Sequence, residues 1–95
     1  MERSEAEAVL ETLIDDLAAI EHERWAHWQR YMHDKGNRRP DGSLVLPADL
    51  VRRWETQIAT GYADLSESEK SSDREQVRRY LTLIAAALAE RESPG

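Results

Sequence analysis

Residues 17–35, LAAIEHERWAHWQRYMHDK, decide the fold. Large apolar side chains recur in this stretch at intervals of three and four residues, which is the spacing of one helix face. The pattern begins further upstream, at Leu10, and predicts one amphipathic helix over residues 4–35. Gly36 follows the last periodic residue and predicts a left-handed helix end there. The apolar face comprises Leu10, Leu13, Ile14, Leu17, Ile20, Trp25, Trp28, Tyr31 and Met32.

The polar stretch after this helix predicts an irregular loop. Proline presets φ and glycine accepts a positive φ, so the sequence Pro40-Asp41-Gly42 is typical of a turn. Pro47 then suits the first position of a second helix, where its missing N–H costs nothing. That helix is predicted to end at residues 60–61. Its apolar face is Leu50, Val51, Trp54 and Ile58.

A third helix is predicted from a capping box to about Glu90. Ser66 stands at the N-cap with Glu69 three residues later, the pairing that satisfies two helix-end donors. The apolar face of this helix is Val77, Tyr80, Leu81, Ile84 and Leu88. We therefore expect an all-α fold, one small bundle of about three helices over residues 1–95, with an irregular loop between the first two. A chain of this length buries a limited core, so a homo-oligomer is also expected.

Composition excludes several classes of function. Thirteen Lys and Arg against nineteen Asp and Glu give a net charge of −6, which is unfavourable for binding nucleic acid. Cysteine is absent, which excludes disulfides, thiolate metal sites and cysteine nucleophiles. The sequence has no apolar run of the roughly 18 residues that a membrane span needs and no signal peptide, so a cytoplasmic protein without a membrane partner is expected.

Charged residues interrupt the apolar faces of the first and third helices. Glu21 and Arg24 fall within the first face, Lys70 and Asp73 within the third, and Arg74 at its edge. A charge removed from water needs a partner. The four central charges therefore form either a structural network between helices or part of a ligand pocket.

A pocket of this composition suits a nucleotide. Arginine and lysine bind phosphate, and flat aromatic side chains stack on a base. The predicted ligand-binding residues are Glu21, Arg24, Trp25, Trp28, Tyr62, Lys70, Asp73 and Arg74. The three histidines lack metal-ligand spacing, and the sequence contains no phosphate-binding loop or nucleophile elbow. We therefore expect no metal, no cofactor and no enzyme activity.

Two segments resemble a known family. HERW at residues 22–25 and YADLSESEKSSDR at residues 62–74 are similar to the two motifs of the ryanodine-receptor-type (RyR) domain, over about residues 17–85. The resemblance implies a small helical domain, paired in the animal calcium-release channel and found singly or fused in bacteria and phages. It also implies a nucleotide ligand, with Trp25 stacking on the base and Arg24, Lys70 and Arg74 facing phosphate.

The chain departs from that family in two respects. Gly36-Asn37 stands where the family has Gly-Trp, and the chain carries one repeat where the channel site uses two. The leading hypothesis is a non-enzymatic module that senses or sequesters a nucleotide-derived signalling molecule, as in a small phage or mobile-element protein. The alternative is a helical homodimeric interaction module. There, Trp28, Tyr31 and Trp54 form a protein interface, and the charged network is purely structural.

Overall fold

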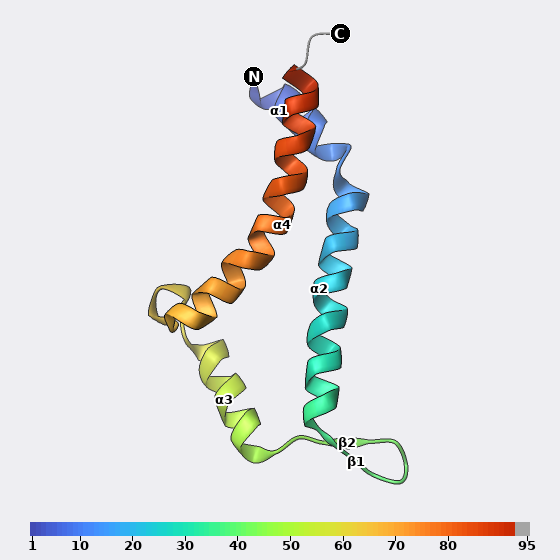
Figure 1. Cartoon of the computed structure of the whole chain (residues 1–95), viewed down its shortest axis with the longest axis vertical. Helices are drawn as coiled ribbons and strands as arrows, with labels where there is room; N and C mark the ends of the chain where they lie inside the picture. Colours follow the sequence, from blue (N-terminus) through green and yellow to red (C-terminus); the bar gives the residue numbers. More distant parts are fainter. Residues whose placement is uncertain (93–95) are drawn as a thin grey trace. The chain divides into compact units, whose positions relative to one another are not determined.

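The computed structural model describes residues 1–92, and residues 93–95 of the predicted domain lie outside the described part. The described chain is mostly helical, with four helices and one short two-stranded ladder (Figure 1). This confirms the all-α class, but with four helices rather than three. The elements in order are α1 (Arg3–Glu11), α2 (Ile14–Lys35), β1 (Asn37–Arg38), β2 (Leu44–Val45), α3 (Ala48–Ala59), a 3₁₀ turn (Tyr62–Asp64) and α4 (Glu67–Glu92).

The predicted N-terminal helix is divided in two, so the expectation of one continuous helix was wrong. The Thr12 hydroxyl donates to the Val9 carbonyl oxygen at 2.6 Å, and the Thr12 backbone N–H donates to the same oxygen at 3.2 Å. The Leu13 N–H donates to the Leu10 carbonyl oxygen at 3.0 Å, which is the same tight i→i−3 pattern. α1 ends at Glu11 with Thr12 as its C-cap, and α2 begins at Ile14.

The predicted turn lies in the hairpin between β1 and β2. Asp41 Oδ1 accepts hydrogen bonds from both the backbone N–H and the hydroxyl of Ser43, at 2.9 and 2.6 Å. Gly42 has a φ of +89°, a conformation that side chains with a Cβ rarely adopt. The two bonds hold the carboxylate in its charged form, so the pKa of Asp41 is lowered. The turn residues identified in the sequence are confirmed.

Gly36 ends α2 in a different way from the one predicted. Among the described residues only Gly42 has a positive φ, so the expected left-handed end at Gly36 was wrong. A Cβ at Gly36 would lie 3.3 Å from the Leu44 Cβ and 3.4 Å from the Leu46 Cδ2. The close approach of Leu44 and Leu46 to the end of the helix therefore favours a residue without a side chain at this position.

Contacts divide the described chain into two compact units. The first unit contains Met1–Arg24 and the described residues from Asp73 onward, and the second contains Trp25–Ser72. In the first unit, Leu13 is 7% exposed and is the only buried hydrophobic residue among those described. An ion pair between Arg91 and Glu5, at 3.6 Å, connects α4 with α1. The first unit therefore has a small core centred on the junction of α1 and α2.

The covered face of α4 differs from the prediction. Tyr80, Ile84 and Leu88 are half-buried as expected, whereas Val77 and Leu81 are exposed. Leu83 and Ala87 are half-buried in addition. The covered arc of α4 thus shares Tyr80, Ile84 and Leu88 with the prediction and is rotated towards Leu83 and Ala87.

The second unit confirms most of the predicted α3 face. Leu50, Val51 and Trp54 are half-buried, and the helix begins at Ala48, one residue after the predicted Pro47 start. Ile58 was placed on the same face, but it is 83% exposed, so that assignment was wrong. Ile58 lies in the last turn of α3, where the described part of the unit provides little cover.

The predicted capping box begins α4. The Ser66 hydroxyl oxygen accepts the Glu69 N–H at 3.2 Å, and the Glu69 carboxylate accepts the Ser66 hydroxyl and N–H at 2.7 and 3.3 Å. Glu69 also accepts the side-chain amide of Gln57 at 2.9 Å, which connects α3 with α4. These bonds lower the pKa of Glu69, with the Ser66 hydroxyl as the main cause.

Replacing Ser66 with alanine is expected to lower the free energy of unfolding by about 1 kcal/mol, the usual cost of losing an N-cap side chain. Urea unfolding followed by circular dichroism measures the loss. Ser72→Ala is the matched control, because Ser72 is an exposed serine inside α4. Equal losses in the two variants would show that the capping bonds contribute nothing.

Candidate functional site

The predicted site residues divide between the two units. Glu21, Arg24, Asp73 and Arg74 belong to the first unit, and Trp25, Trp28, Tyr62 and Lys70 to the second. None of the charged side chains described is fully buried: Arg24, Lys70 and Arg74 are half-buried, and Glu21 and Asp73 are exposed. The physical reason is that long charged side chains keep their heads in water when the cover above them is thin.

Glu21 and Arg24 form the best-defined polar cluster of the first unit. The Glu21 carboxylate accepts two bonds from the Arg24 guanidinium, one of them from Nε at 3.1 Å. It also accepts the Tyr80 hydroxyl at 2.5 Å. The side chains of Glu21 and Arg24 are 53% and 41% exposed. The cluster therefore lies at the surface, with the positive charge of Arg24 already matched by a carboxylate.

The electrostatics follow from these bonds. Arg24, first, and Tyr80, second, stabilise the charged carboxylate and lower the pKa of Glu21 from 4.5 to about 2. The hydrogen bonds to Glu21 are in turn the main cause of the raised pKa of Arg24 and the raised pKa of Tyr80. An arginine paired in this way is less available to a phosphate than an unpaired one, because the carboxylate would have to be displaced.

Two residues of this region were not predicted as polar partners. Tyr80 was assigned to an apolar face, and Arg79, which forms an ion pair with Glu23, was not singled out as a site residue. The hydroxyl of Tyr80 could have indicated a polar partner, because a covered tyrosine usually has a hydrogen-bond partner for its hydroxyl. Of the acid–base pair predicted on α4, Lys70 is half-buried and Asp73 is exposed. Arg74, predicted at the edge of the same face, is half-buried.

Lys70 lies beside an exposed aromatic ring in the second unit. Its Nζ is 5.8 Å from the centroid of the Tyr62 ring, within the range of a cation–π contact. Tyr62 is exposed. The two predicted residues are therefore brought together, as a cation next to an open flat surface.

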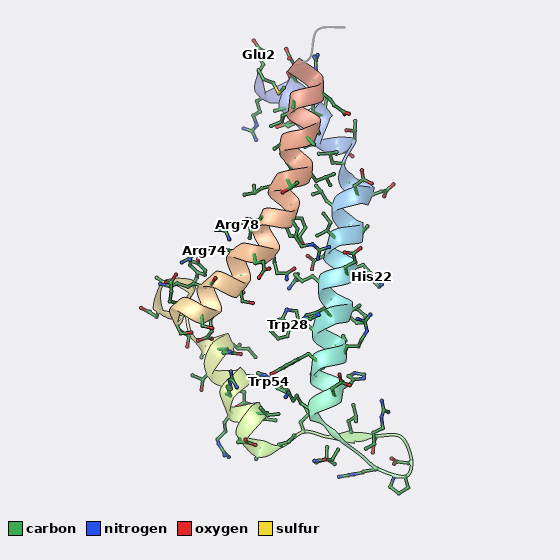
Figure 2. The ribbon with its side chains drawn as sticks, in the orientation of Figure 1. Glu2, His22, Trp28, Trp54, Arg74 and Arg78 are labelled. Carbon is green, nitrogen blue, oxygen red and sulfur yellow. The ribbon has the colours of Figure 1, made fainter. Side chains whose placement is uncertain are left out.

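Trp28 and Tyr31 of α2 line a groove with α3. Trp28 is 47% exposed, and its ring meets Tyr31 edge-on with centroids 5.7 Å apart. Figure 2 labels Trp28 on α2 and Trp54 on α3, two of the side chains that line a hollow of about 480 Å³. We call this hollow the aromatic groove. Its lining residues are Trp28, Gln29, Tyr31, Met32, Trp54, Gln57 and Ile58.

The aromatic groove has an unusual composition for a surface of this chain. None of its described lining residues is charged, although 34% of the whole sequence is. Lys35 stands at its border, with Nζ 5.4 Å from the centroid of the Tyr31 ring. Trp25, the predicted base-stacking residue, is exposed on α2 and is not among the lining residues. The structure thus gathers Trp28, Tyr31 and Trp54 on one surface and leaves Trp25 outside it.

A second hollow of about 570 Å³, which no sequence pattern predicted, lies between α3 and the start of α4. Its border includes Arg53, Asp64 and Glu69. Because Glu69 is engaged by Ser66 and Gln57, the polar groups in this hollow already serve to join the helices.

Residues 1–92 contain no group of three or more histidine, aspartate or glutamate side chains placed to hold a metal ion. Within the same range, no helix has the length and hydropathy of a membrane-spanning segment.

The resemblance to the ryanodine-receptor-type domain stays a prediction that depends on its two motifs. Comparison of the chain with protein-family models, curated proteins and solved structures found no match.

Proposed function

We propose that this chain is a non-enzymatic helical interaction module that binds another protein chain through the aromatic groove. The observation that carries the proposal is the uncharged lining of the groove, in which Trp28 remains 47% exposed and Ile58 83% exposed. The centres of protein interfaces are enriched in Trp, Tyr and Met and depleted of charge. Aromatic anchors in such places supply most of the binding energy.

The distribution of charge supports the same function. Arg24 is paired with Glu21, and the Tyr80 hydroxyl completes the cluster within the first unit. These contacts fit a structural role for the polar residues, as in the second hypothesis drawn from the sequence. The aromatic groove, in contrast, has large apolar side chains open to water, and such surfaces commonly mark binding sites.

Photo-crosslinking in cells that encode the chain tests this function. A photoreactive amino acid at Gln29, which lines the groove, is expected to give a covalent product with a protein identified by mass spectrometry. The matched control carries the same group at Arg30, which helical geometry places on the opposite face of α2. If Gln29 gives no more product than Arg30, the groove is not a protein interface and the proposal is wrong.

A nucleotide-type ligand is the second candidate, because Lys70 and the exposed Tyr62 ring offer a cation beside a flat aromatic surface. We expect a nucleotide that binds only the folded chain to add about 2.7 kcal/mol of stability at about 100 times its dissociation constant. Thermal unfolding in the presence of ATP, ADP, ADP-ribose and cyclic nucleotides measures this shift. The shift should disappear in Lys70→Ala, with Lys35→Ala as the control that keeps it. Unchanged melting with every compound would exclude this candidate.

A further inference from the structure

We infer that the partner seated on the aromatic groove is a second copy of this chain, in a dimer with two-fold symmetry. The inference rests on the proposed function of the groove as a protein interface and adds the identity of its partner. In such a dimer the same patch meets itself, so the patch must be self-complementary.

The aromatic groove has the two features that self-complementarity needs. Ile58 lines the groove and projects from it, with 83% of its surface exposed. The hollow of about 480 Å³ beside it is bordered by Trp28 and Trp54. A two-fold axis through the patch lets the Ile58 side chain of each copy enter the hollow of the other. One symmetric contact then covers both the projecting side chain and the aromatic walls.

The placement of charge favours a second copy over an oppositely charged partner. Residues 25–72 contain seven Lys and Arg and seven Asp and Glu, so the second unit is formally neutral. The whole excess of six negative charges lies in the first unit. Two copies that meet through their second units therefore avoid the like-charge repulsion expected for a chain of net charge −6.

The small core gives the dimer a stabilising role. Leu13 is the only buried hydrophobic residue among those described, whereas Trp28, Tyr31 and Ile58 are exposed on one surface. Small domains that bury little apolar surface internally commonly bury more of it by oligomerisation. Pairing through the groove removes these three side chains from water at once.

The mass of the purified full chain in solution tests the inference. Size-exclusion chromatography with light scattering, from micromolar to near-millimolar concentration, is expected to show a dimer that persists in high salt, because the groove is uncharged. Ile58→Asp is expected to weaken the dimer by about thirtyfold or more, the effect of losing a central interface residue. The exposed position of Ile58 makes the variant compatible with a folded chain. If it nevertheless unfolds, Ile58→Ser, which adds no charge, takes its place.

Val45→Asp is the matched control. It puts the same charge on another exposed hydrophobic residue of the second unit, outside the groove, and should leave the dimer intact. A wild-type chain that is monomeric throughout overturns the inference, as does a dimer that Ile58→Asp leaves unchanged. A monomeric chain whose Gln29 crosslinks to a different protein rejects the second copy but retains the groove as an interface. A monomeric chain with no crosslink rejects both the second copy as the partner and the groove as a protein interface.

Discussion

Replacing Leu13 with alanine is expected to lower the free energy of unfolding of the chain by about 3 kcal/mol, within the usual range for a buried leucine. Leu13 is 7% exposed and lies between α1 and α2. Its carbonyl oxygen accepts the Leu17 N–H at 2.8 Å, so it also begins the ladder of α2. The truncation therefore leaves a cavity at the point where the two helices are joined.

Urea unfolding followed by circular dichroism measures the Leu13→Ala effect. Leu10→Ala is the matched control, because Leu10 belongs to the same predicted apolar face but is exposed in the structure. Its loss should be well below that of Leu13. Similar losses at the two positions would contradict the burial pattern of the first unit, and would mean that another surface covers Leu10 in solution.

Features set by neighbouring residues were predictable from the sequence. The α3 boundaries, the turn at Asp41 and Gly42 and the capping box at Ser66 and Glu69 depend on contacts within a few residues. Each has a specific chemical cause, such as a fixed φ or a side chain that satisfies a backbone donor. These predictions were confirmed for that reason.

Features set by tertiary cover were less predictable. The break between α1 and α2 is formed by tight i→i−3 backbone bonds at Thr12 and Leu13, which periodicity does not detect. The exposure of Ile58 and Leu81 depends on what lies above each helix face, and a periodic pattern fixes only which residues share a face. The same applies to the charges on the predicted apolar faces, of which Arg24 and Lys70 are half-buried and Glu21 and Asp73 exposed.

For the candidate site, the sequence predicted which side chains take part more successfully than which of them contact one another. Trp28, Tyr31 and Trp54 were predicted to share a surface, and the structure places all three in one groove. Glu21 and Arg24 were predicted to lie on one helix face, and the structure joins them by hydrogen bonds, but Tyr80 was missed as the third member of the cluster. Partners that lie 59 positions apart in sequence, as Tyr80 and Glu21 do, cannot be matched from spacing along one helix.

The Glu21 carboxyl is expected to titrate with a pKa of about 2, and removal of its main partner in Arg24→Ala should return the pKa towards its ordinary value of 4.5. Tyr80→Phe should cause a smaller rise, because the Tyr80 hydroxyl is the second cause of the lowered pKa. Carboxyl chemical shifts followed by NMR across the acid range measure both. The carboxyl of Asp41, whose pKa is lowered by its bonds to Ser43, is the internal control and should keep that lowered pKa in Arg24→Ala.

The same cluster has a consequence for acid stability. Because the pKa of Glu21 is lower in the folded chain than in the unfolded one, its stabilising contribution is complete above about pH 4.5 and is lost as the pH falls towards 2. Glu21→Gln should therefore flatten that part of the pH dependence of unfolding. If Arg24→Ala abolishes both the lowered pKa of Glu21 and the stability in acid, Arg24 is a structural partner of Glu21. If Arg24→Ala instead leaves both unchanged, the arginine is not held by Glu21 in solution and is available to an anionic ligand, which would favour the nucleotide over the protein partner.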